Sequence, residues 1–289
     1  MTIIAFIGSV FSPYYHWSGR GRPDDHVAFN VALYSPSGSF WCMTERGSTS
    51  LRRDAHGLRI GRSSLSMRAD RLLIDFSETA LPWPGQRLWP KAVSGRVEVI
   101  PDICADRLFS LDPAGRHVWS PRMPRARATI TCDALPGGGW QGRAYHDMNY
   151  GDRALEQDFI GWDWARGHEG VDGDTVILYD ALACQGTRRR LALRYDGRQG
   201  PQPLHMPDRQ GLPRGFWGVR AGIACDPATT PRLLHRLEDS PFYTRSRVET
   251  VLDGRRFDMM QETLDCRRLS HPLVRLMLPF RMPRRALRG

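Results

Sequence analysis

Short runs rich in apolar, β-branched and aromatic residues recur along most of this chain, and glycine- or proline-containing segments separate the runs. Such runs are typical of β-strands. They predict strands in "HVAFNVALYS", "SFWCMTERG", "RLLIDFSET", "SGRVEVIPD", "RATITCD", "DTVILYDALAC" and "RRLALRYDG". Turn sequences such as "PSGS", "DPAGR" and "PGGG" lie between strands. Short strands at this spacing indicate a sandwich or a barrel.

Helical patterns are scarce. "GDRALEQDFIGWDWAR", residues 151–166, is the one stretch with a helical pattern of any length. The change from aromatic to Gly/Asp-rich sequence in "WDWARGHEGVDGD" predicts a division near residues 160–170, and "GRQGPQPLHMPDRQGLPRG" predicts a long surface connection. We therefore predict an all-β protein with few helices and two β domains, residues 1–165 and 166–289.

The composition is that of a folded globular protein, with 41% hydrophobic and 10% aromatic residues. A net charge of +10 favours an anionic partner, which would be nucleic acid, an anionic membrane surface or an acidic substrate. Because zinc-ligand spacings and RNA-recognition signatures are absent, we expect no nucleic-acid partner. The six cysteines are widely separated and include no C-x-x-C pair, which fits a reducing cytoplasm.

The C-terminal sequence "CRRLSHPLVRLMLPFRMPRRALRG" interleaves apolar residues with arginines. Two interpretations stay open: a segment that lies on an anionic bilayer, or a closing strand followed by a solvated tail. The N-terminal "MTIIAFIGSVF" lacks the basic region of a secretory signal, and no window approaches the roughly eighteen apolar residues of a membrane span. Any membrane contact is therefore expected to be peripheral.

Several catalytic and cofactor motifs are absent from the sequence: G-x-G-x-x-G on a strand-to-helix turn, Walker A, H-E-x-x-H and G-x-S-x-G. "PGGGW", residues 136–140, indicates a hairpin turn because a strand follows it. We therefore predict a function without a nucleotide, flavin or metal cofactor.

The chemistry that remains is a set of acids among aromatic residues. "AYHDMNYG" places Tyr145, His146, Asp147 and Tyr150 together, and "LEDSPFYTRS" places Asp239 near Tyr243. Nearby in sequence are further aromatic residues and acids: Trp119, Trp140, Trp162, Trp164, Glu156, Asp158 and Asp163. A carboxylic acid in a water-poor aromatic pocket has a raised pKa and can donate a proton, while aromatic faces stabilise a cation. Acid-initiated carbocation chemistry on an alkene requires both.

Each of these residues also has a purely structural interpretation. Strand alternation puts Tyr145 and Asp147 on one face and His146 and Tyr150 on the other, so Asp147 could face solvent and His146 could be a core histidine. Tryptophans in a β core commonly serve packing. Asp239, just before "SPFY", could cap a turn.

Two long stretches carry a family resemblance: "FIGSVFSPYYHWSGR", residues 6–20, and "YHDMNYGDRALEQDFIGWDWAR", residues 145–166. Together with "NVALYSPSG", "LEDSPFYTRS" and the overall length, they resemble the bacterial carotenoid 1,2-hydratases, or hydroxyneurosporene synthases, of the spheroidene and spirilloxanthin pathways. The resemblance implies two successive lipocalin-like (calycin) β-barrels. It also implies a cofactor-independent hydro-lyase that adds water to the terminal C1=C2 bond of acyclic carotenoids such as neurosporene or lycopene.

On this hypothesis Asp147 is the proton donor, Tyr145 orients it, and His146 or His117 holds the water. Asp239 is a reserve acid, which an interface between two barrels could bring close. The expected substrate-binding residues are Trp119, His117, Trp140, Tyr150, Trp162, Trp164 and Tyr243. A lipid-soluble substrate implies a cytoplasmic protein that is peripheral on the inner photosynthetic membrane. Two rivals stay open: a non-catalytic lipid or carotenoid carrier, and another carbocation or pericyclic enzyme acting on a polyene or terpenoid.

Overall fold

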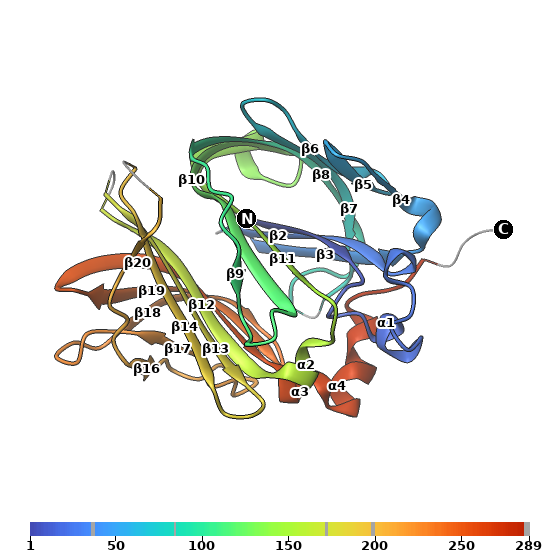
Figure 1. Cartoon of the computed structure of the whole chain (residues 1–289). Coiled ribbons are helices and arrows are strands. Elements are labelled where there is room, and N and C mark those ends of the chain that lie inside the picture. The colour runs from blue at the N-terminus through green and yellow to red at the C-terminus, as the bar shows by residue number, and fades with distance from the viewer. Residues whose placement is uncertain (36–37, 84, 171–172, 198–199, 286–289) are drawn as a thin grey trace. The chain divides into compact units, whose positions relative to one another are not determined.

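The computed structural model describes residues 1–35, 38–83, 85–170, 173–197 and 200–285, and it consists mostly of antiparallel β-strands (Figure 1). The predicted all-β class with few helices is confirmed. The chain forms two compact units, one from residues 1–101, 126–144 and 275–289, the other from residues 102–125 and 145–274. The division predicted after residue 165 falls within strand β12 (Phe159–Glu169), which belongs entirely to the second unit.

The first unit contains the strands from the N-terminal part of the chain, and they pair in the order β1-β2-β3-β7-β6-β5-β4, with β8 beside β7. Their bounds are β1 Thr2–Ile7, β2 Val27–Ser35, β3 Gly38–Arg46, β4 Leu51–Arg53, β5 Gly57–Ile60, β6 Ser63–Met67, β7 Leu72–Ala80 and β8 Lys91–Ile103. Short helical segments connect some of them: α1 Pro13–Trp17, η1 Pro23–Asp25 and η2 Ser48–Ser50. In β7 buried and half-buried residues alternate, as the sequence pattern predicts.

Two long strands pass from one unit into the other. They are β10 (His117–Cys132) and β11 (Gly139–Gly151), which pair with each other and are joined by η3 (Pro136–Gly138). The ends of these strands in the second unit are residues 117–125 and 145–151. The "AYHDMNYG" motif therefore does lie in a strand, as predicted.

The second unit is built on a sheet with the order β15-β14-β13-β12-β20-β19-β18, and a separate hairpin pairs β16 with β17. The bounds are β9 Phe109–Ser110, α2 Leu155–Asp158, β13 Thr175–Ala183, β14 Arg188–Tyr195, β15 Gln202–Pro203, β16 Arg209–Gly211, β17 Gly222–Ala224, β18 Arg232–Asp239, β19 Tyr243–Leu252 and β20 Arg255–Asp265. The predicted surface connection at residues 197–215 holds β15 and β16 and is otherwise irregular among its described residues.

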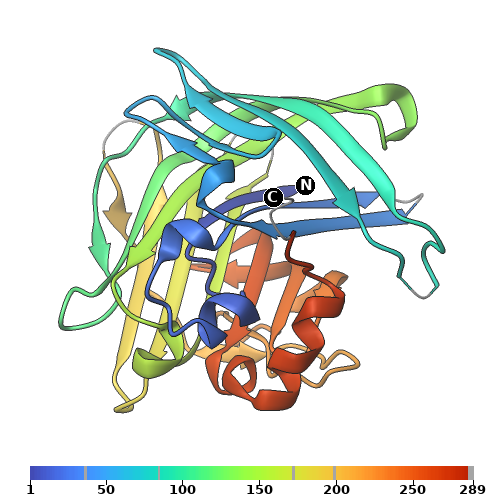
Figure 2. The same cartoon turned by 90° about the vertical axis from the view of Figure 1, so that its right-hand side faces the viewer.

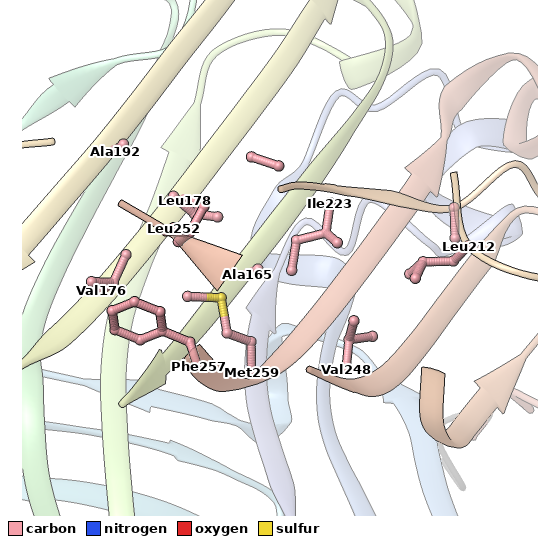
Figure 3. Close-up of a cluster of buried hydrophobic side chains, with 12 residues drawn as sticks. Ala165, Val176, Leu178, Ala192, Leu212, Ile223, Val248, Leu252, Phe257 and Met259 are labelled. Atoms are coloured by element: carbon pink, nitrogen blue, oxygen red, sulfur yellow. The ribbon is translucent and has the colours of Figure 1, made fainter. Parts of the chain in front are cut away.

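One face of this sheet packs on an apolar core (Figure 3). Ala165 of β12, Leu178 of β13 and Met259 of β20 belong to this core, together with Val248 and Phe257. Because successive strand residues point to opposite faces, the tryptophans Trp162 and Trp164 point away from it. The other face of the sheet is thereby lined with aromatic residues.

The helix predicted over residues 151–166 is wrong for most of its length. Only Leu155–Asp158 is helical, and β12 begins at Phe159. The segment forms a strand because β12 pairs along its length with both β13 and β20. Trp162 lies opposite Ala181 of β13, and His168 lies opposite Asp258 of β20. Tertiary pairing on both sides overrides a weak helical periodicity.

The C-terminal segment is helical rather than a closing strand, with α3 (Cys266–Ser270), α4 (Pro272–Met277) and η4 (Leu278–Phe280) (Figure 2). In the first unit its end is held by the fully buried Glu45, whose backbone N–H donates to the Pro283 carbonyl at 3.0 Å. The Glu45 carboxylate contacts both His26, at 2.8 Å, and the Arg284 guanidinium. No helix among the described residues has the length and apolarity to cross a membrane.

Candidate active site

The Asp147 carboxylate accepts two hydrogen bonds on the same oxygen. Trp119 Nε1, from β10, donates to Asp147 Oδ2 at 2.9 Å, and Tyr145 Oη, two residues earlier on β11, donates to it at 3.1 Å. Tyr145 and Asp147 share a face of β11 because strand residues two apart point the same way. The Asn149 side chain is a further hydrogen-bond partner of this carboxyl group.

Aromatic rings surround this carboxyl group. The Trp119 ring is fully buried and lies 5.4 Å from the Tyr179 ring and 5.4 Å from the Phe109 ring. The Tyr145 ring packs 5.4 Å from that of Trp164. Strand pairing sets Trp164 of β12 between Tyr179 of β13 and Glu262 of β20, so these three side chains share one face of the sheet.

Burial raises the pKa of Asp147 to about 6, and the negative charge of Glu262 contributes to the rise. The hydrogen bonds from Trp119 and Tyr145 act in the opposite direction, because they stabilise the carboxylate. Burial and the Asp147 charge raise the pKa of Tyr145, so its phenol remains a donor. At neutral pH roughly one Asp147 in ten carries a proton, which makes it a usable general acid.

His117 forms a second polar pair in the same unit. Its Nε2 lies 2.8 Å from Asp158 Oδ2, and its ring packs edge-on against Phe159 at 4.9 Å. Asp158 also faces Arg153 at 3.4 Å. A carboxylate on one ring nitrogen fixes the tautomer and orientation of an imidazole. His117 is therefore held in a defined orientation, with Asp158 as the group that holds it.

The register of the sheet shows which of the other predicted aromatic residues lie on the aromatic face. Trp162 lies 6.3 Å from Tyr179, and Tyr243 is in line with Trp162 through Leu264, so both share the aromatic face. Tyr150 is 51% exposed at the end of β11. Trp140, 38% exposed, belongs to the first unit, and its role stays a prediction.

Asp239 and His146 are placed differently from Asp147. Asp239 pairs with Thr244, which is in line with Asp163 on the apolar-core face of the sheet, and its Oδ2 accepts from the Trp217 backbone N–H at 3.4 Å. The structure therefore does not bring the reserve acid to the Asp147 side. His146 lies on the opposite face of β11, and burial lowers its pKa to about 4.

Asp163 is a second buried carboxylate with a raised pKa, again through burial. It faces the other side of β12, where the Arg209 guanidinium pairs with it and the Gly222 N–H donates to it at 3.3 Å. An ion pair with arginine favours the ionised form of a carboxylate and uses its oxygens as hydrogen-bond acceptors. Asp163 is thus a structural acid and a matched comparison for Asp147.

A cavity of about 480 Å³ lies in the first unit beside Tyr14, Trp17 and His26. Ser18 Oγ lies 3.0 Å from His26 Nε2 and Glu45 Oε1 lies 2.8 Å from His26 Nδ1, an arrangement that resembles a hydrolase triad. The Ser18 hydroxyl, however, donates to the Tyr15 carbonyl at 2.9 Å, and Arg284 binds Glu45. The cluster therefore anchors the C-terminal segment and is not arranged as a nucleophile.

Sequence reasoning missed Tyr179, Glu262 and the His117–Asp158 pair. Tyr179 lies in the apolar strand "DTVILYDALAC" and carries no local signal of a site role. Glu262 is one of several acidic residues in the predicted strands, and nothing in its local sequence sets it apart. Their roles depend on which strands become neighbours, and a pairing register cannot be deduced from the pattern of one strand.

The fold and the site define an antiparallel β protein that presents a protonatable carboxylic acid to an aromatic face. The chain belongs to the carotenoid hydratase CrtC family, whose model matches residues 3–289. The recognition of this family from its motifs is confirmed.

The relatives cover nearly the whole chain. The acyclic carotenoid 1,2-hydratase of Thiocapsa roseopersicina is 43% identical over 98% of this chain and 69% of the relative. The enzymes of the same name from Rubrivivax gelatinosus and Cereibacter sphaeroides are 38% and 37% identical over 99% and 98% of this chain, and the matches cover 70% and 98% of those relatives.

The fold is similar to that of a solved structure. The crystal structure of a Nitrosomonas europaea protein described as a candidate AttH matches with a TM-score of 0.52 and 12% identity, covering 83% of this chain and 81% of that one. At this identity the match concerns the fold alone.

Proposed function

We propose that this protein is a carotenoid 1,2-hydratase, a hydro-lyase that adds water to the terminal C1=C2 bond of acyclic carotenoids such as neurosporene and lycopene. Family membership supports the reaction class. The observation that carries the proposal is Asp147, a buried carboxylic acid with a pKa of about 6 that is oriented by Trp119 and Tyr145 in an aromatic surround.

The first step is proton transfer. Asp147 delivers its carboxyl proton to C2, the π electrons of C1=C2 form the new C–H bond, and a tertiary cation is left at C1. The rings of Trp119, Trp164 and Tyr179 lie around the acid and provide π faces that stabilise this cation.

Water then adds at C1, and the oxonium loses one proton to give the tertiary alcohol. His117 is the proposed acceptor, because Asp158 fixes its ring and stabilises the imidazolium that forms. Exchange with solvent returns a proton to Asp147 and removes one from His117. Atoms and charge balance with substrate and water, so the proposed reaction uses no cofactor.

We further propose a cytoplasmic protein that is peripheral on the inner photosynthetic membrane, where a long hydrocarbon substrate is dissolved. The C-terminal segment supports this location. Leu276 and Phe280 are 58% and 81% exposed, and the chain from residue 267 to its end contains seven arginines and no acidic residue.

The test is to incubate the purified protein, without added cofactor, with lycopene or neurosporene in liposomes and ¹⁸O-labelled water, and to analyse the pigment by mass spectrometry. The expected product is heavier by one labelled water. Asp147→Asn should lose turnover by several orders of magnitude, while Asp163→Asn, the matched variant on the other face of β12, should retain it. An unchanged pigment that copurifies with the protein would favour the carrier hypothesis.

A further inference from the structure

The loop between β7 and β8 exposes large apolar side chains in the first unit, among its described residues 81–83 and 85–90. Leu88 is 84% exposed and its neighbour Trp89 is 79% exposed, while Trp83 is 39% exposed. Isolated exposed hydrophobic residues are common, but several large ones on one short loop mark a contact surface.

Basic side chains flank these residues and are held in place. The Arg87 guanidinium lies 4.5 Å from the centre of the Phe40 ring, and the Lys91 ammonium lies 5.0 Å from the same ring. Arg87 also donates to the Ser39 carbonyl. The loop sequence "LPWPGQRLWPK" contains no aspartate or glutamate. Tryptophan and leucine beside fixed cations form the side-chain combination that anchors proteins at a bilayer interface.

The loop is joined to the C-terminal segment of the same unit. The Arg281 guanidinium lies 4.6 Å from the ring of Trp83, in the loop, and 4.6 Å from the ring of Trp41, in β3. Phe280, which precedes Arg281, is 81% exposed. This contact connects two exposed apolar segments that are nearly two hundred residues apart in sequence.

We propose that the β7–β8 loop inserts Leu88 and Trp89 into the surface of an anionic bilayer, with Arg87, Lys91 and Arg281 at the level of the lipid phosphates. Charge selects this occupant over a second copy of the chain, because two such loops facing each other would bring like charges together. The inference rests on the proposed function for its purpose, which is access to a substrate dissolved in lipid. The binding itself can be measured without any carotenoid.

The experiment is vesicle flotation of the full chain with phosphatidylcholine vesicles, with and without phosphatidylglycerol. The wild type should float with anionic vesicles and be released by high salt. The Leu88→Glu/Trp89→Glu variant should partition at least tenfold less. The matched variant Phe216→Glu, which changes a 90% exposed residue of the second unit, should float like the wild type.

Equal flotation of wild type and the double variant would overturn the proposal. So would a wild type that is dimeric without lipid and becomes monomeric in the double variant, because the loop would then be a protein interface. Hydration of detergent-dispersed lycopene is measured on the same proteins. If flotation depends on the loop but no hydration occurs, the proposed function fails and the membrane anchor stands.

Discussion

Trp119 Nε1 donates to Asp147 Oδ2 at 2.9 Å across the paired strands β10 and β11. The tryptophan has no exposed surface, so its indole cannot swing away without disturbing the rings of Phe109 and Tyr179 packed on it. A buried, immobile donor therefore fixes the orientation of the acid before any substrate arrives. Such preorganisation lowers the reorganisation needed at the moment of proton transfer.

The rate of hydration should fall as pH rises through about 6, because burial raises the pKa of Asp147 to about 6 and only the protonated form donates. Well above that pH, kcat/KM should drop about tenfold per pH unit until another step takes over. Initial rates with detergent-dispersed lycopene across the neutral range give the profile. A rate that rises over the same range would contradict the assignment of Asp147 as the acid.

Asp147→Asn should stabilise the protein near neutral pH while abolishing turnover. Because the pKa of Asp147 is higher in the folded state, the protonated side chain favours folding. This contribution to the free energy of unfolding is complete below the unfolded pKa of 3.8 and is lost as pH rises through about 6. Above that pH the buried charge costs the wild type about 3 kcal/mol, which asparagine avoids.

Urea unfolding of both proteins at acidic and mildly alkaline pH measures this difference. The gain should be present at the higher pH and vanish at the lower one. Equal free energies of unfolding for wild type and variant at both pH values would show that ionisation of Asp147 does not destabilise the folded protein.

Trp119→Phe should shift the pH–rate profile of hydration toward higher pH. The indole hydrogen bond lowers the pKa of Asp147, so its removal raises that pKa by about one unit. Trp162→Phe serves as the control, since Trp162 belongs to the aromatic face but its ring packs against Phe159 and Tyr179. Profiles that shift equally in both variants would indicate a general packing effect.

Gly151→Ala should disturb the His117–Asp158 pair. A Cβ at position 151 would lie 2.7 Å from His117 Nδ1 and 2.8 Å from the Arg116 carbonyl oxygen, closer than real contacts allow. We expect a loss of about 1–3 kcal/mol in the free energy of unfolding and a turnover reduced tenfold or more. Gly142→Ala, whose Cβ would meet Trp140 at an ordinary 3.7 Å, should leave turnover unchanged.

Arg284→Ala should destabilise the first unit by about 3–5 kcal/mol, because it leaves the fully buried Glu45 without its guanidinium partner. The free energy of unfolding from urea titration measures this loss. The double variant Glu45→Gln/Arg284→Met removes both charges and should recover most of it. A double variant no more stable than Arg284→Ala would mean that the ion pair is not the source of the loss.

The sequence by itself determined the strand-rich class and the pairing of Tyr145 with Asp147. A short apolar run between turn sequences is a local pattern, so "HVAFNVALYS" and "DTVILYDALAC" identify β2 and β13, which are buried on both faces, without any knowledge of their neighbours. Residues two apart on a strand share a face, so a phenol beside the carboxylic acid followed from "YHD" alone.

Only the tertiary structure decided the rest of the site. Trp119 and Asp147 are 28 residues apart, and His117 and Asp158 are 41 apart, so neither contact has a local sequence signal. The segment from Phe159 became a strand because β13 and β20 pair with it on both sides, and that same register places Tyr179 and Glu262 beside Trp164. Register and strand order arise from the burial of whole sheets, a property of the complete chain that no single stretch contains.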